Sequence, residues 1–119
     1  MLFTNNMYTV TQIIELINKG NIQAFYNERF WRSFSKQIIK EQHGECQYCK
    51  RRGKYTKATL VHHVKHLRIH PELAYSRYYE DEQRNKHRQL VALCHSCHEE
   101  QHERIKVKNS NLYRNEERW

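Results

Sequence analysis

Two Cys-x-x-Cys pairs place the strongest constraint on how this chain can fold. Cys46 and Cys49 form the first pair, and Cys94 and Cys97 form the second. In a reducing compartment such pairs hold zinc far more often than they form disulfides. Four thiolates complete the tetrahedral shell of a zinc ion and leave no position for a substrate. We therefore expect a closed structural zinc site, against the alternative of four buried or free thiols that share this spacing by chance.

The composition indicates one small domain that needs such a site. The chain has 119 residues, of which 38% are hydrophobic, and its mean hydropathy is −1.05. A core of this size is thin. Structural zinc contributes about 10–16 kcal/mol in peptide hosts, so it can stabilise such a domain.

The charge points to a polyanionic partner. The net charge is +8, which favours nucleic acid first and an anionic membrane second. The apolar runs are too short for a transmembrane span. The N-terminus lacks the basic start, apolar middle and cleavage site of a secretory signal. We therefore expect a cytoplasmic protein that binds DNA and not a membrane.

Helical patterns dominate the first part of the chain. Thr9 and Gln12 form a potential capping box for a helix that ends at Gly20. A second helix is predicted from about residue 27 to residue 43, with an aromatic stripe that includes Trp31 and Phe34. A stripe at helical spacing normally faces a core, and stacking on bases is the less favoured alternative.

The second part of the chain is predicted to mix strands with a final helix. Residues 58–64 and 90–93 are typical of strands, and residues 96–106 are typical of a helix. Residues 75–88 show no clear period, so we expect an irregular insertion or a short helix there. Residues 109–119 are expected to form a loosely ordered tail.

Histidines near these elements form a second pattern that suggests metal chemistry. His62 and His63 close the first predicted strand, and His98 and His102 lie four residues apart on the predicted last helix. An i, i+4 pair presents two imidazoles on one helix face, and His62 can supply a third ligand to a divalent cation. His63 is then available as a general base that activates water for phosphodiester hydrolysis. His66 is the strongest rival ligand.

Basic residues flank these motifs. We expect phosphate contacts that are independent of DNA sequence, against the alternative of solvated charged faces. The residues concerned are Arg51, Arg52, Lys54 and Arg88.

Together these motifs resemble the zinc-containing HNH endonucleases. The resemblance rests on the two cysteine pairs, on Leu-Val-His-His-Val at 60–64, and on Leu-Cys-His-Ser-Cys-His-Glu-Glu-Gln-His at 93–102. It also includes Phe-Tyr-x-x-x-x-Trp-Arg at 25–32. It implies an α+β fold: a small ββα-metal (His-Me finger) domain at 25–108, preceded by an N-terminal helical segment at 1–24 and followed by a tail at 109–119.

The resemblance also implies roles for particular residues. It makes His63 the general base and His62, His98 and His102 the ligands of a catalytic divalent cation such as Mg²⁺, Mn²⁺, Ni²⁺ or Zn²⁺. The family usually has an asparagine that braces the loop bearing the base, and Gln89 stands at that position. Asn85 is the alternative brace. Small stand-alone members encoded by phages also imply a role in DNA packaging with a terminase as partner.

The sequence therefore predicts a metal-dependent DNA endonuclease that nicks DNA, cuts both strands, or does both. The alternative is a catalytically silent zinc module that binds nucleic acid. A silent module has no need for a His-His pair at a strand end together with an i, i+4 His pair on the next helix.

Overall fold

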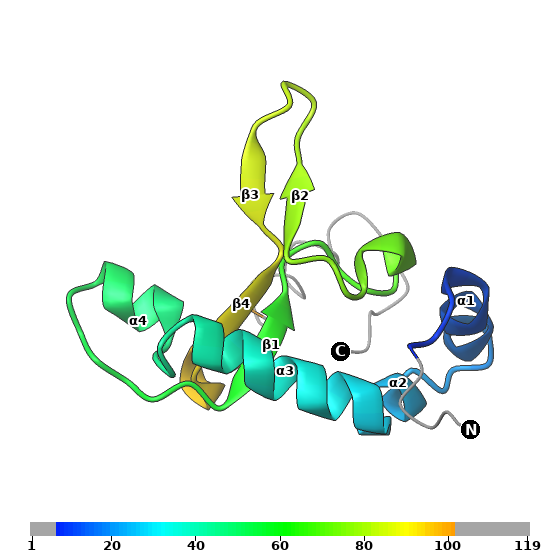
Figure 1. Ribbon diagram of the computed structural model, residues 1–119, viewed down its shortest axis with the longest axis horizontal. Helices are drawn as coiled ribbons and strands as arrows, with labels where there is room; N and C mark the ends of the chain where they lie inside the picture. The colour runs from blue at the N-terminus through cyan, green and yellow to red at the C-terminus, as the bar shows by residue number, and fades with distance from the viewer. Residues whose placement is uncertain (1–6, 102–119) are drawn as a thin grey trace.

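The computed structural model describes residues 7–101, which form an α+β fold as predicted (Figure 1). Four helices come first: α1 (Val10–Asn18), α2 (Gln23–Asn27), α3 (Arg29–Glu41) and α4 (Gln47–Arg51). They are followed by β1 (Leu60–His63), the 3-10 turn η1 (Pro71–Leu73), β2 (Tyr78–Glu80), β3 (Lys86–Arg88) and β4 (Leu90–Leu93). Residues 95–101 are helical. The predicted tail lies outside the described residues.

Local signals set the helix ends. The Thr9 hydroxyl accepts a hydrogen bond from the Gln12 amide at 3.1 Å, and Gln12 Oε1 accepts one from the Thr9 amide at 2.9 Å. This confirms the predicted capping box at the start of α1. The second predicted helix corresponds to α3, and the short helix α2 before it was not predicted. Glu28 separates the two helices: its backbone is extended (ψ 143°), and its side chain caps α3 by accepting a hydrogen bond from the Phe30 amide at 2.7 Å.

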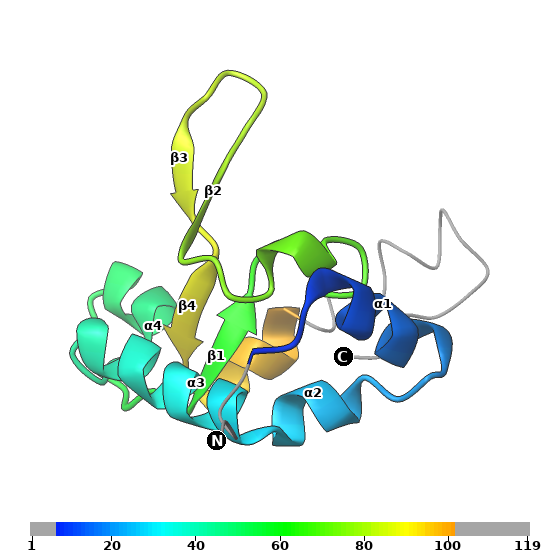
Figure 2. The same cartoon turned by 45° about the vertical axis from the view of Figure 1, so that its right-hand side comes forward.

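The central sheet has two antiparallel strands, β1 and β4, and α3 packs against both (Figure 2). Leu60 pairs with Leu93 and His63 pairs with Leu90. Both predicted strands are confirmed, and the first is shortened to Leu60–His63. The side chain of Gln42 lies beside β4 and replaces a third strand there: its Nε2 donates to Leu90 O and its Oε1 accepts from the Ala92 amide, both at 3.0 Å.

Residues 75–88 contain a β-hairpin, so the prediction of an irregular insertion or short helix was wrong. Strands β2 and β3 pair and project away from the rest of the fold in both views (Figures 1 and 2). The turn depends on Asp81, whose Oδ1 accepts from the Gln83 amide at 2.9 Å and the Asn85 amide at 2.8 Å. Because neither face of this hairpin is buried, its sequence carries no alternation of apolar and polar residues.

The buried side chains form two clusters on either side of the β1 and β4 strands. One cluster joins α1, α2 and α3 to the sheet and contains Trp31 at 5% exposure, which confirms that the aromatic stripe faces the core. Phe34 packs partly buried against it. The second cluster surrounds the four cysteines, with Val91 and Leu93 of β4. Among residues 7–101, no helix combines the length and apolar character needed to cross a bilayer.

Candidate metal centre and active site

The four cysteines converge on one buried point, which we call the four-cysteine cluster. Cys46 caps α4 and Cys49 lies within it, whereas Cys94 and Cys97 stand at the end of β4 and the start of the last helix. All four Sγ atoms lie within 4.8 Å of one another. Antiparallel pairing of β1 with β4 brings the second pair next to the first. No other group of three or more metal-ligating side chains is found among residues 7–101.

The spacing of the thiols fits zinc. Cys49 Sγ lies 3.9 Å from Cys94 Sγ and 3.7 Å from Cys97 Sγ. Four sulfurs at about 2.3 Å from a central zinc ion stand about 3.8 Å apart in a tetrahedron. A hydrogen bond from Thr56 and bonds from the other thiols lower the pKa of Cys49 to about 6, whereas burial raises the pKa of Cys97 to about 12. Even without a metal ion, the cluster therefore favours a thiolate at Cys49.

Arg52 has a role in this cluster that the sequence interpretation missed. Its Nη2 lies 3.2 Å from Cys97 Sγ and 3.7 Å from Cys49 Sγ. These hydrogen bonds raise the pKa of Arg52. Its Nη1 also lies 4.0 Å from the carboxylate of Glu100. The position of Arg52, three residues after Cys49 in the same tight turn, was the available signal. A guanidinium here offsets the negative charge of the thiolates.

The histidines meet at a second site, which we call the histidine cavity. Its volume is about 300 Å³, and it lies between α2, α3, β1 and the last helix. His62 and His63 enter it from β1, and His98 enters it from the helix after β4. The other lining residues are Gln23, Tyr26, Trp31, Ser35, Thr59, Leu60, Val61 and Leu67.

His63 is held in one orientation. Its Nε2 lies 3.0 Å from Ala74 O, and since a carbonyl oxygen only accepts, Nε2 carries the proton and Nδ1 keeps a lone pair. The ring stacks on Trp31 with centroids 5.0 Å apart. Burial lowers the pKa of His63 to about 4, and the hydrogen bond to Ala74 offsets only part of this shift. The imidazole is therefore neutral at pH 7.

The predicted cation ligands are brought together in part. The rings of His62 and His98 meet edge to face with centroids 5.4 Å apart, although the two residues lie on different elements. His102, the predicted third ligand, lies outside the described residues. Within 7–101, the cavity lining does not include His66, the rival ligand. Its backbone oxygen accepts hydrogen bonds from the amides of Ile69 and His70.

Gln89 makes the contacts that a bracing residue needs. Its side chain is fully buried. Oε1 accepts a hydrogen bond from the Lys65 amide at 2.8 Å, and Nε2 donates one to Lys65 O at 2.9 Å. The Gln89 backbone oxygen also accepts from the Val64 amide at 2.9 Å. These bonds hold the chain just after His63. Asn85, the alternative, lies exposed in the hairpin turn.

The four predicted phosphate contacts have different surroundings. Arg51 and Lys54 are exposed, and the guanidinium of Arg51 lies 4.9 Å from the centre of the Tyr48 ring. Arg52 is engaged with the four-cysteine cluster. Arg88 is half-buried, and its Nε donates to Leu90 O at 2.8 Å.

Two antiparallel strands, a following helix and a buried four-cysteine cluster that is consistent with a zinc site define a ββα-metal type of α+β fold. Among solved structures, the HNH endonuclease of the deep-sea thermophilic bacteriophage GVE2, crystallised with manganese ion, is similar to this chain. The TM-score is 0.60 at 22% sequence identity, over 85% of this chain and 98% of that one. No family model and no curated protein matches the sequence. The likeness confirms the predicted fold class and the resemblance to HNH endonucleases in structure.

Proposed function

We propose that this protein is a metal-dependent DNA endonuclease that hydrolyses phosphodiester bonds. One observation carries the proposal: His62, His63 and His98 come from two separate elements and line one cavity. The net charge of +8 suits a DNA substrate. The fold shared with a phage HNH endonuclease supports the same reaction class.

In this proposal His63 is the general base. Its Nδ1 accepts a proton from water, while Nε2 stays bonded to Ala74 O. Stacking on Trp31 prevents the ring from turning away from the cavity. Gln89 acts as a positioning residue, because its two bonds to Lys65 fix the backbone that follows the base.

A divalent cation would be held by His62 and His98, with His102 as the third predicted ligand. Neutral imidazoles are suitable donors for Mn²⁺, Ni²⁺ or Zn²⁺, and Mg²⁺ is the other predicted ion. When bound, such a cation supplies positive charge to the phosphate oxygens and to the leaving oxygen. Because imidazoles carry no negative charge, the protein leaves that positive charge uncompensated. The four-cysteine cluster would hold a separate zinc ion that stabilises the fold.

The test is cleavage of supercoiled plasmid by purified protein. The protein is first treated with chelator, its zinc content is measured to confirm that one ion per chain remains, and Mg²⁺, Mn²⁺, Ni²⁺ and Zn²⁺ are then added in turn. We expect open-circular or linear DNA with at least one cation and none without. Failure of all cations would favour a silent zinc module that binds nucleic acid. A role in phage DNA packaging with a terminase partner stays a prediction of the resemblance.

A further inference from the structure

A second hollow, which we call the α4 groove, lies away from the histidine cavity. Its volume is about 500 Å³. It is formed by α4, by the residue that follows α3, and by the start of β4, and it shares no lining residue with the histidine cavity. The lining residues are Gln42, Gln47, Lys50, Arg51, Arg88 and Val91.

The charged side chains that line the α4 groove are all basic. Lys50 and Arg51 are exposed on α4, and Arg88 reaches the groove from β3, far along the sequence. Among residues 7–101, no carboxylate lies within ion-pair distance of Lys50 or Arg51. The aromatic ring of Tyr48 lies 4.9 Å from the Arg51 guanidinium carbon and leaves its charge in place.

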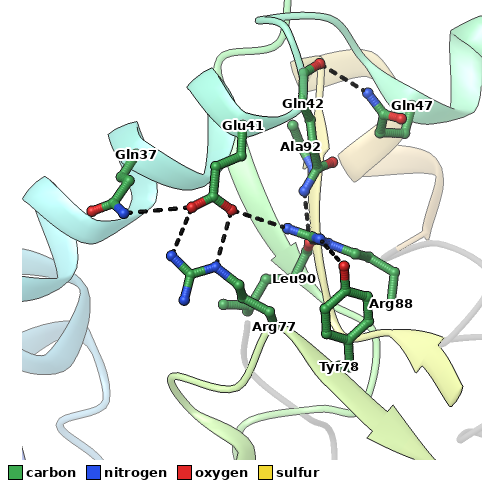
Figure 3. A network of polar contacts seen from close by, with 9 residues as sticks. All are labelled: Gln37, Glu41, Gln42, Gln47, Arg77, Tyr78, Arg88, Leu90 and Ala92. Atoms are coloured by element: carbon green, nitrogen blue, oxygen red, sulfur yellow. Dashed lines mark hydrogen bonds and ion pairs between the residues drawn. The ribbon is translucent and has the colours of Figure 1, made fainter.

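Within residues 7–101, Arg88 has one acidic partner, Glu41, which it shares with a second arginine (Figure 3). Arg77 makes a bidentate contact with Glu41: its Nε donates to Glu41 Oε1 at 3.0 Å, and its Nη2 donates to Glu41 Oε2 at 2.7 Å. Arg88 Nη2 stands farther away, at 3.7 Å. In the described part of the chain, this nitrogen is the one buried side-chain polar atom without a hydrogen bond. The single negative charge of Glu41 cannot neutralise both Arg77 and Arg88, so one positive charge is left beside the groove.

The guanidinium of Arg88 is nonetheless fixed in place. Its Nε donates to Leu90 O at 2.8 Å, and its Nη1 donates to the Tyr78 hydroxyl at 3.1 Å. A fixed cation loses little conformational entropy when an anion binds beside it. Lys50 and Arg51 of α4 add two more cations to the lining of the groove. The groove thus presents a preorganised positive charge with an incomplete set of anionic partners.

We propose that the α4 groove binds a backbone phosphate of duplex DNA through Lys50, Arg51 and Arg88. The inference rests on the proposed function in taking DNA as the ligand. Trp31 and Ser35 of α3 line the histidine cavity, and Gln42 at the end of α3 lines the groove. At 1.5 Å per residue along the helix axis, these positions lie about 10 to 16 Å apart. Phosphates of one strand advance about 3.4 Å each along the duplex axis. The groove therefore holds a phosphate several nucleotides from the one that is cut.

The experiment measures binding of a fluorescently labelled DNA duplex at several salt concentrations, with no divalent cation added. The double variant Lys50→Gln/Arg51→Gln should lower the magnitude of the slope of log affinity against log salt by about 1, since one lost phosphate contact removes about 0.9. The matched control is Lys19→Gln/Lys36→Gln, which removes the same charge from exposed positions outside the groove. The control should keep the wild-type slope.

Plasmid cleavage is measured in parallel so that the two proposals fail separately. If the double variant has the same slope as its control, the proposed phosphate site in the α4 groove is overturned, even if the wild-type protein cleaves DNA. A lowered slope supports the groove, even if no cation produces cleavage. Equal competition by an RNA duplex of the same length would overturn the assignment to DNA. Circular dichroism of both double variants verifies that the fold is retained.

Discussion

The four-cysteine cluster and the histidine cavity, which we propose hold a structural and a catalytic metal ion, are built in opposite ways. The cluster is complete within residues 7–101: four thiols meet at zinc spacing and Arg52 covers them. Within residues 7–101, the histidine cavity brings together two of the three predicted ligands, His62 and His98. It also contains the neutral His63 and has a volume of about 300 Å³. A saturated site suits stabilisation of the fold, whereas an open site suits chemistry. The variants below test this division.

The largest effect is expected at the cluster. If the cluster holds the proposed zinc ion, Cys94→Ser removes one of its four ligands, so we expect loss of zinc and of the folded state, because structural zinc sites contribute much of the folding free energy of small domains. Metal analysis and circular dichroism measure both. A folded Cys94→Ser protein with one zinc per chain would contradict the structural role of the cluster.

The next effect concerns the histidine cavity, where the base and the ligands should respond differently. His63→Ala should reduce cleavage by about 10²- to 10⁴-fold and leave cation affinity unchanged, because it removes the proton acceptor and none of the predicted ligands. Circular dichroism checks that the fold survives the loss of this buried ring. His98→Ala should weaken cation binding, so that higher Mn²⁺ partly restores cleavage. Calorimetric titration of the cation beside single-turnover cleavage separates the two.

His95→Ala is the matched control for these variants, because His95 is exposed on the same helix as His98. Among the residues that the structure describes, its one ion-pair partner is Glu99 at 3.9 Å. It should change neither quantity. If His63→Ala loses the cation as His98→Ala does, the assignment of the base is wrong and His62 becomes the alternative.

A smaller effect is expected at Gln89, which holds the chain just after His63. Gln89→Ala leaves the amide and carbonyl of Lys65 without partners, so the free energy of unfolding should fall by about 2 kcal/mol. Cleavage should fall as well, because the chain after His63 loses its brace. Asn85→Ala should change neither, and urea denaturation with a cleavage assay measures both. If Asn85→Ala lowered stability and cleavage and Gln89→Ala did not, Asn85 would be the bracing residue.

The smallest effect is expected at the rim of the cluster. Arg52→Gln should weaken zinc binding about tenfold, because the thiolates lose a charged donor. Competition with a coloured chelator measures this affinity. Arg51→Gln removes the same charge from the neighbouring position, and its zinc affinity should equal that of the wild type. Equal zinc affinities of the two variants would show that Arg52 has no part in the metal centre.

Much of the fold could be predicted because its signals are local. The capping box at Thr9, the strand Leu90–Leu93 that runs up to Cys94 and the Cys-x-x-Cys turns each depend on residues a few positions apart. The β2–β3 hairpin was missed because it is exposed on both faces, and an exposed strand needs no apolar alternation. The short helix α4 was missed because its N-cap is Cys46, which is not one of the residue types that usually cap a helix.

The sequence by itself determined the cysteine spacing, the positions of His62, His63 and His98, and the excess of positive charge. Only the tertiary structure decided what surrounds them. Ala74 O orients His63, and Gln42 covers the edge of β4. Arg88 meets α4 across a groove. Each of these contacts joins distant parts of the chain, and such contacts depend on strand pairing and packing, which no local pattern of residues specifies.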